Sequence, residues 1–161
     1  MLALGLAVAA LAALLDQVSK LWVLQYFGEA GCANRMMPVT SFFDFVLTCN
    51  RGVSFGFFNQ PGQPALGFWI FSVLAALVVI ALVVWLFRVR SPLLAVAIGL
   101  VIGGAIGNVV DRLRFGAVVD FLDVHAGVWH WPAFNVADSA ICIGVALMLI
   151  DSLLVRRELR T

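Results

Sequence analysis

Four long apolar runs alternate along the chain with shorter segments that hold most of the charged residues. A helix crosses the roughly 30 Å hydrocarbon core of a bilayer with about 20 residues, because each residue adds about 1.5 Å. The runs therefore predict four membrane-spanning helices, at residues 2–24, 66–87, 93–110 and 134–155. Pro92 stands at the start of the third run, where its missing N–H is tolerated.

The first run differs from a plain hydrophobic anchor because Asp16 and Lys20 lie within it. A cleaved signal peptide would begin with basic residues and would end in small residues at the cleavage site. Here no basic residue precedes the run, and a carboxylate and an ammonium follow where small residues would stand. We therefore expect the first helix to be retained as an anchor.

Composition supports residence in a membrane. Of the 161 residues, 63% are hydrophobic and 12% are charged, whereas a soluble domain averages roughly half apolar and about a quarter charged residues. The formal charge of +1 gives no sign of a surface for nucleic acid. We expect one domain over residues 1–161: an all-α membrane protein of four transmembrane helices with a small extracytoplasmic β-rich or amphipathic segment. That segment is Ser41 to Phe58, which is rich in Phe and β-branched residues.

Arginines at the ends of the predicted helices suggest an orientation. Basic residues in short flanks favour the cytoplasmic side of a membrane. One group lies between the second and third helices and another follows the fourth, so both termini are expected in the cytoplasm. These arginines are Arg88, Arg90, Arg156, Arg157 and Arg160.

Polar residues recur near the outer ends of the predicted helices, where lipid would make an ionisable group costly. Asp16 and Lys20 are four residues apart and can pair on one helix face. Four carboxyl groups are expected to converge at one membrane depth: those of Asp16, Asp111, Asp120 and Asp138. Asn108 and Arg112 lie close to Asp111 in the sequence, and Asn135 lies three residues before Asp138.

Glycines recur at every fourth position of the third helix, from Gly99 to Gly107. Such a stripe of small residues lets another helix approach closely. Gly104, Asn108 and Asp111 fall on a narrow face beside the stripe. We therefore expect these two polar side chains to point into the bundle.

Inward-facing carboxyl groups indicate acid–base chemistry. Two adjacent carboxyls in a poorly solvated site share one proton, because both cannot be ionised together. One then activates water and the other protonates a carbonyl oxygen, which is amide hydrolysis of the aspartic type. No serine or cysteine stands with a histidine to suggest a nucleophile relay. His125 and His130 with Asp123 match no standard zinc spacing, so no metal or cofactor is expected.

Two other classes of protein remain open. Intramembrane acids also build proton relays in transporters and channels. Here the acidic residues lie together near one face of the membrane, and the second predicted helix contains no series of polar groups that could relay a proton. Asp151, near the cytoplasmic end, could extend such a relay across the membrane. A side chain that reaches toward water would explain the position of Asp151 equally well. A purely structural membrane subunit would have little reason to retain so many inward charges.

The three cysteines form neither a disulfide framework nor a zinc pattern. Cys32 and Cys49 are expected on the outer side, where they could form a disulfide. Cys142 is expected to pack within the fourth helix as a small apolar residue. None is expected to serve more than a structural role.

Five motifs, in order, resemble those of the bacterial lipoprotein signal peptidase family, also called signal peptidase II. The resemblance extends over nearly the whole chain. One departure is Cys49, which precedes the second motif where many members carry a bulkier residue. The motifs are DQVSK (16–20), NRGVSFG (50–56), GGAIGNVVDR (103–112), GAVVDF (116–121) and FNVAD (134–138).

The resemblance implies a four-helix aspartic peptidase of the bacterial inner membrane, with its active site facing the periplasm. Its substrates would be prolipoproteins that carry diacylglycerol on a cysteine, and it would cut just before that cysteine. By motif, the catalytic residues would be Asp120 and Asp138. Asp123 is the less favoured alternative to Asp120, because side chains alternate along an extended segment and Asp123 would point away.

The same resemblance implies roles for the other polar residues. Asn50, Asn108, Arg112 and Asn135 would line the substrate groove. Asp16 and Lys20 would support the site from the first helix, and Asp111 would pair with Arg112 or brace the site. The implied partners are lipid-modified prolipoproteins and membrane lipid, and the protein is expected to act as a monomer.

Overall fold

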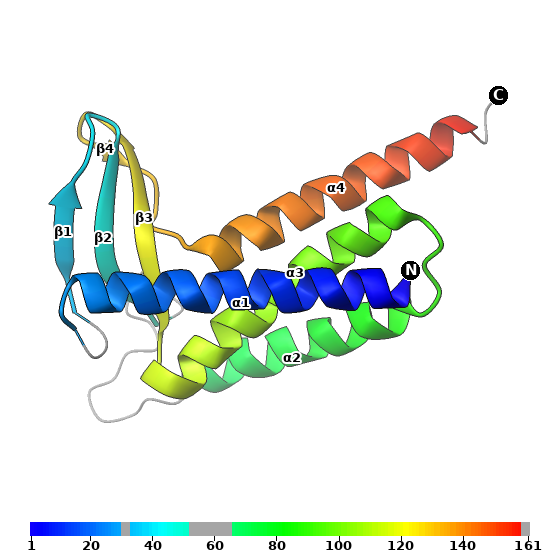
Figure 1. The fold of residues 1–161 in the computed structure, drawn as a ribbon, viewed down its shortest axis with the longest axis horizontal. Helices are drawn as coiled ribbons and strands as arrows, with labels where there is room; N and C mark the ends of the chain where they lie inside the picture. Colours follow the sequence, from blue (N-terminus) through cyan, green and yellow to red (C-terminus); the bar gives the residue numbers. More distant parts are fainter. Residues whose placement is uncertain (30–32, 52–65, 159–161) are drawn as a thin grey trace.

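The computed structural model describes residues 1–29, 33–51 and 66–158, without the side chains of 66–67 and 155–158. Four helices run side by side in alternating directions (Figure 1). Each is long and apolar enough to cross a membrane, which confirms the predicted architecture. The helices are α1 Leu2–Tyr26, α2 Leu66–Leu86, α3 Pro92–Phe115 and α4 Val136–Glu158.

α3 continues past the predicted end at Val110 to Phe115, so Arg112 and Arg114 lie on its last turn and not in a loop. Two local features explain the extension. Cations near a helix C-terminus interact favourably with the exposed carbonyl groups. The helix then ends at Gly116, which takes the left-handed conformation (φ 70°) and donates its N–H to the Arg112 carbonyl.

α3 is the central helix, because it packs against α1 and α4 along much of its length and also against α2. Glycines make this packing possible. A Cβ at Gly99 or Gly103 would collide with backbone carbonyl oxygens of α1, and one at Gly104 would collide with the Ala137 carbonyl of α4. The predicted stripe of small residues is therefore confirmed, and it faces α1.

A small antiparallel sheet lies at one end of the bundle, at the left of Figure 1, and the N-terminus lies at the other. Its strands follow the order β1-β2-β3-β4. β2 covers part of the segment expected to be β-rich, while residues 52–58 of that segment lie outside the described residues. The strands are β1 Arg35–Pro38, β2 Phe43–Asn50, β3 Val118–Ala126 and β4 Trp129–His130.

An apolar cluster fastens the sheet to the end of α1. Val23 and Leu24 of α1 pack against Leu47 of β2 and against Val119 and Phe121 of β3. All five side chains are buried. This packing fixes the part of β3 that carries Asp120, whose immediate neighbours Val119 and Phe121 both belong to the cluster.

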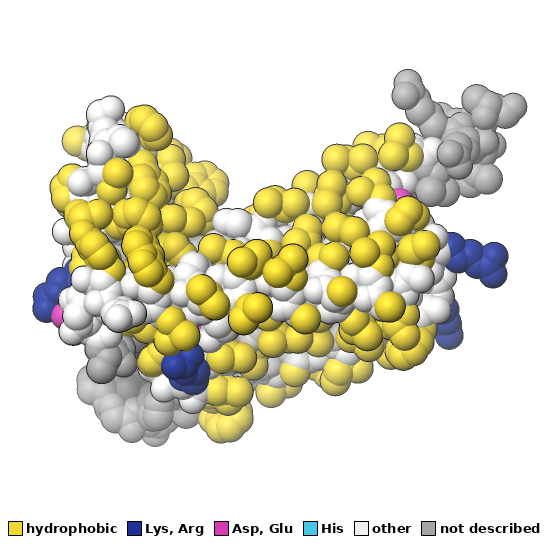
Figure 2. All heavy atoms as spheres, viewed as in Figure 1, with side chains coloured by type: hydrophobic (Ala, Val, Ile, Leu, Met, Phe, Trp, Pro, Cys, Tyr) yellow, Lys and Arg dark blue, Asp and Glu magenta, His cyan; other side chains and the backbone are white. Residues whose placement is uncertain are grey.

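The outer surface of the bundle suits lipid. Figure 2 shows hydrophobic side chains spread along the helices, with Lys and Arg side chains near the two ends. Large apolar residues such as Leu14, Leu77 and Leu153 are each exposed by more than half. Trp129 and Trp131, expected as interfacial aromatics, are also exposed, beside the sheet end of α4.

The surroundings of two cysteines and of Asp151 bear on their expected roles. Cys49 is disulfide-bonded, while Cys32 lies outside the described residues. Cys142 is a free thiol exposed on α4, so it does not pack inside the bundle as expected. Asp151 is buried and accepts a 2.6 Å hydrogen bond from the Ser91 hydroxyl at the start of α3, so it does not reach toward water.

The contact between α1 and α3 leads to a prediction about stability. We expect Gly103→Ala to destabilise the fold by about 1–3 kcal/mol, because the added methyl would meet the Ala9 carbonyl oxygen and the Ala12 side chain. Thermal unfolding in detergent measures the effect. Ala10→Val, which adds carbon atoms at an exposed position of α1, is the matched control and should unfold like the wild type. An unchanged melting temperature for Gly103→Ala would contradict the close approach.

Candidate active site

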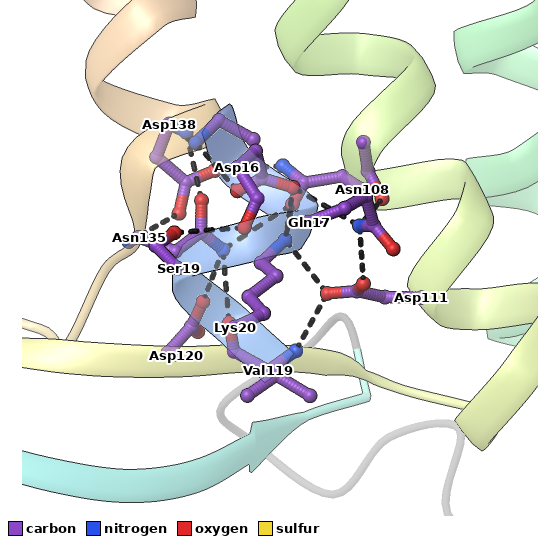
Figure 3. A network of polar contacts seen from close by, with 12 residues as sticks. Asp16, Gln17, Ser19, Lys20, Asn108, Asp111, Val119, Asp120, Asn135 and Asp138 are labelled. Carbon is purple, nitrogen blue, oxygen red and sulfur yellow. Dashed lines mark hydrogen bonds and ion pairs between the residues drawn. The ribbon is translucent and has the colours of Figure 1, made fainter. Parts of the chain in front are cut away.

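The structure brings the predicted polar residues together at the sheet end of the bundle (Figure 3). They come from α1, α3, β3 and α4, and each is joined to at least one other by a hydrogen bond or an ion pair. The residues in this network are Asp16, Lys20, Asn108, Asp111, Asp120, Asn135 and Asp138.

Asn135 directly precedes α4 and positions Asp138. The Asn135 side-chain oxygen accepts a hydrogen bond from the Asp138 backbone N–H at 2.9 Å, and the Asp138 Oδ2 accepts one from the Asn135 N–H at 3.3 Å. This reciprocal pair is a capping box, which satisfies two N–H groups that a helix start leaves unpaired. The local signal that starts α4 therefore also fixes the carboxyl group of Asp138.

Asn135 also holds Asp120. Its Nδ2 donates to the Asp120 Oδ1 at 2.7 Å and lies 3.2 Å from the Val119 carbonyl oxygen. Asp120 is only 2% exposed, and the Asn50 side chain supplies a further hydrogen bond to its carboxyl group. Burial, followed by the nearby charge of Asp138, raises the pKa of Asp120 from 3.8 to about 7.

Asn108 of α3 joins the two halves of the site. Its Nδ2 donates to the Asp138 Oδ1 at 2.8 Å. Its Oδ1 accepts hydrogen bonds from Lys20 at 3.1 Å and from Asn135 at 3.2 Å. Lys20 can only donate, so its contact fixes which end of the Asn108 amide faces Asp138.

Lys20 lies between two carboxylates in the interior. Its ammonium is 2.8 Å from the Asp16 Oδ2 and 2.7 Å from the Asp111 Oδ2. The predicted pairing of Asp16 with Lys20 is therefore confirmed, and Asp111 pairs with Lys20. All three side chains are almost fully buried, so each charge depends on its protein partners and not on water.

Asp16 also reaches α4. Its Oδ1 accepts a hydrogen bond from the Ala137 N–H at 2.9 Å, which satisfies another N–H group in the first turn of α4. Gly107 makes room for this carboxylate, because a Cβ there would collide with the Asp16 Oδ2. The last glycine of the stripe therefore serves the polar network as well as helix packing.

Gln17 belongs to the network, although the sequence analysis did not select it. Its Nε2 donates to the Asp111 Oδ1 at 2.9 Å and lies 3.2 Å from the Gly107 carbonyl oxygen. A polar residue directly after Asp16, inside an apolar run, was the available signal. Gln carries no charge, so this position alone does not predict a role in the site.

Arg112 and Asn50 lie at the more exposed edge of the site. The Arg112 guanidinium donates to the Asn108 carbonyl oxygen at 3.2 Å and stands over the Phe71 ring of α2 at 5.8 Å. The charges of Asp138 and Asp120 act on it as well. Positive charge is thus available beside the two carboxyl groups.

Asp123 belongs to a separate cluster on the sheet. Its carboxyl group contacts His130 at 2.8 Å, and the rings of His125 and His130 stack with centroids 4.7 Å apart. His125 in turn lies 3.3 Å from Asp44 of β2. Within the described part of the chain, no three such side chains are arranged to hold a metal ion.

Comparisons with known proteins point to one family. The sequence pattern of the family described as Signal peptidase (SPase) II matches residues 8–154. The lipoprotein signal peptidase of Methylorubrum extorquens (strain PA1) is 50% identical over 139 residues, which cover 86% of this chain and 79% of the relative. That of Janthinobacterium sp. (strain Marseille) is 46% identical and covers 92% of this chain and 87% of its own.

Two solved structures share the fold. A bacterial membrane enzyme solved at 1.9 Å by the in meso method has a TM-score of 0.74 and 29% identity, with 92% of each chain covered. A second such enzyme, at 2.3 Å, has a TM-score of 0.72 and 28% identity, and covers 92% of this chain and 87% of its own. Because the family pattern and the relatives extend over most of its length, this chain belongs to the signal peptidase II family.

Proposed function

We propose that the protein is an aspartic endopeptidase that removes the signal peptide from diacylglyceryl-modified prolipoproteins, cutting just before the lipidated cysteine. Membership of the signal peptidase II family, whose named relatives are lipoprotein signal peptidases, supports proteolysis of lipoprotein precursors. The observation that carries the aspartic mechanism is the link between Asp120 and Asp138: Asn135 donates to both carboxyl groups, and Asn108 joins Asn135 to Asp138.

The two carboxyl groups differ in a way that assigns their roles. Asp120 is buried and its pKa is raised to about 7, so it is the better place for the shared proton. Asp138 is only partly buried and stands at the start of α4. In the proposed reaction the Asp138 carboxylate takes a proton from water, and the resulting hydroxide attacks the peptide carbonyl carbon.

The remaining steps follow from the same assignment. Asp120 gives its proton to the carbonyl oxygen, which produces a neutral tetrahedral diol. The proton held by Asp138 then passes to the amide nitrogen, the C–N bond breaks, and Asp120 recovers its proton from the collapsing diol. No covalent intermediate forms, and the dyad returns to its starting state.

Contacts with the substrate are assigned by exposure. Arg112 and Asn50 reach the more exposed edge, so we propose that they contact the peptide backbone. The amides of Asn108 and Asn135 are occupied with the two aspartates and with each other. We therefore place them beneath the groove, where they orient the dyad while Arg112 and Asn50 meet the substrate.

The proposed orientation places the sheet and the dyad on the periplasmic side of the bacterial inner membrane. Arg88 and Arg90 lie between α2 and α3, at the end of the bundle opposite the sheet (Figure 1), and short basic flanks favour the cytoplasm. We further propose that the protein acts as a monomer, because one chain supplies both carboxyl groups and the residues that hold them.

The dyad is tested by replacing each aspartate with asparagine. Asp120→Asn and Asp138→Asn keep the size and polarity of the side chain but remove the ionisable group, so cleavage should fall below detection while the protein remains folded. Purified variants are assayed on a lipidated precursor peptide. Asp123→Asn, on the separate histidine cluster, is the matched control and should retain turnover. Substantial cleavage by either dyad variant would contradict the assignment.

The raised pKa of Asp120 leads to a prediction about pH. Because the proposed acid must be protonated, kcat/KM should decline as pH rises through about 7, where the free enzyme loses this proton. Above that point the rate should fall about tenfold per pH unit. The measurement is a pH profile on lipidated peptide, with thermal unfolding recorded at each pH to exclude denaturation. A rate that stays constant up to about pH 9 would show that Asp120 is not the acid.

The proposed substrate class predicts a requirement for lipid. A buried acyl chain contributes roughly 0.8 kcal/mol per methylene to membrane binding, so two chains would hold the scissile bond at the depth of the dyad. We expect cleavage of a precursor peptide to depend on its diacylglyceryl group, in the same detergent and at the same concentration. Equal rates with and without the lipid would remove lipid anchoring from the mechanism.

A further inference from the structure

The peptide groups next to the two dyad aspartates are held in matching ways. Ala137, directly before Asp138, donates its N–H to the Asp16 Oδ1 at 2.9 Å. Val119, directly before Asp120, donates its N–H to the Asp111 Oδ2 at 3.1 Å. Each dyad residue is therefore preceded by a backbone group bound to a buried carboxylate from another element.

Lys20 joins these two carboxylates. Its ammonium lies 2.8 Å from the Asp16 Oδ2 and 2.7 Å from the Asp111 Oδ2 (Figure 3). Its contact with the Asn108 Oδ1, at 3.1 Å, turns the Asn108 Nδ2 toward Asp138. The three N–H donors of an ammonium thus match three acceptors. The Asp16 and Asp111 carboxylates accept hydrogen bonds from α4 and β3, the two elements that carry the dyad. The third acceptor, Asn108, donates to Asp138 itself.

We propose that Lys20 is a positioning residue for hydrolysis: its ammonium sets the position of Asp138 relative to Asp120 by tying together the groups that hold each of them. This inference rests on the proposed function, because it assumes that these two aspartates perform the reaction. It goes beyond general support of the site by assigning Lys20 to the geometry of the dyad.

A purely structural role would have a different signature. If Lys20 only balanced two buried negative charges, its loss would lower the amount of folded protein, and the molecules that still fold would react normally. If it sets the dyad geometry, folded molecules will bind substrate normally and react slowly. A misplacement of about 1 Å can lower a rate about 100-fold, so the effect should appear in kcat and not in KM.

The first variant removes the bridge without leaving unpaired charges. The triple substitution Asp16→Asn, Lys20→Met and Asp111→Asn removes all three charges and retains side-chain oxygens that can accept from the Ala137 and Val119 N–H groups. We expect kcat to fall about 100-fold, with KM unchanged, in protein that is folded by size-exclusion chromatography and thermal unfolding. Wild-type kcat per folded molecule would overturn the proposal.

A second variant keeps the proposal testable if the triple variant does not fold. Lys20→Arg retains the positive charge but replaces the compact ammonium with a planar guanidinium, which cannot reproduce the same three contacts. Folded Lys20→Arg should also show a reduced kcat, and wild-type turnover would again refute the proposal. Asp151→Asn is the matched control: this buried carboxylate binds Ser91 at the opposite end of α3, and its loss should leave kcat unchanged.

Asp138→Asn in the same assay distinguishes a failure of the proposed function from a failure of the positioning role of Lys20. If Asp138→Asn still cleaves the lipidated peptide, the proposed function fails, whatever the Lys20 variants do. If Asp138→Asn is inactive while the folded triple variant or Lys20→Arg cleaves like the wild type, only the positioning role of Lys20 is wrong.

Discussion

Backbone contact between α3 and its neighbours is the constraint on which the rest of the site depends. In a bilayer no water is available to a buried polar group, so its partners must come from the protein. Asp and Asn have short side chains and can reach a neighbouring helix only when the two backbones almost touch. The glycines of α3 allow that approach. At Gly107 the Asp16 carboxylate occupies the space that a side chain would fill. Helix packing and the polar network are thus one feature.

The sequence predicted the parts of the fold that depend on local composition. The four helices followed from the length of the apolar runs, and the inward direction of Asn108 and Asp111 followed from their place beside the glycine stripe. The predicted end of α3 was wrong. Hydropathy falls at the first charged residues, whereas the helix continues until Gly116 turns the backbone. The end of an apolar run indicates where the chain leaves the hydrocarbon core of the membrane, and a helix can continue beyond that point.

Other features could not be predicted because they depend on contacts between distant segments. The sequence left open whether Asp111 would pair with Arg112 or brace the site, and Lys20 binds it from another helix. The contact of Asp151 with Ser91 joins residues 60 positions apart, so it was not evident from the spacing of either residue. The candidate dyad came from motif resemblance, since composition and spacing alone leave the choice among buried acids open.

The arrangement of the acids also bears on the classes that the sequence left open. A proton relay across a membrane needs titratable groups at successive depths. Among the described residues, Asp16 and Asp111 instead surround one ammonium, and Asp120 and Asp138 both accept hydrogen bonds from Asn135 at the same end of the bundle. Asp151 lies at the other end, bound to a helix start, and does not continue this cluster. The distribution fits a localised reaction centre better than a pathway.

The hydrogen bond from Ala137 to Asp16 joins residues 121 positions apart, from the first and the last membrane helix. This has a consequence for biogenesis. During synthesis α1 is made before α4. The Asp16 carboxylate therefore lacks the Ala137 N–H as a partner until α4 has been made. The proposed dyad includes Asp138 of α4, so it can form only when the final helix has docked, and a half-inserted chain holds no complete dyad. Under the proposed function, the chain would therefore have no proteolytic activity before its own insertion is complete.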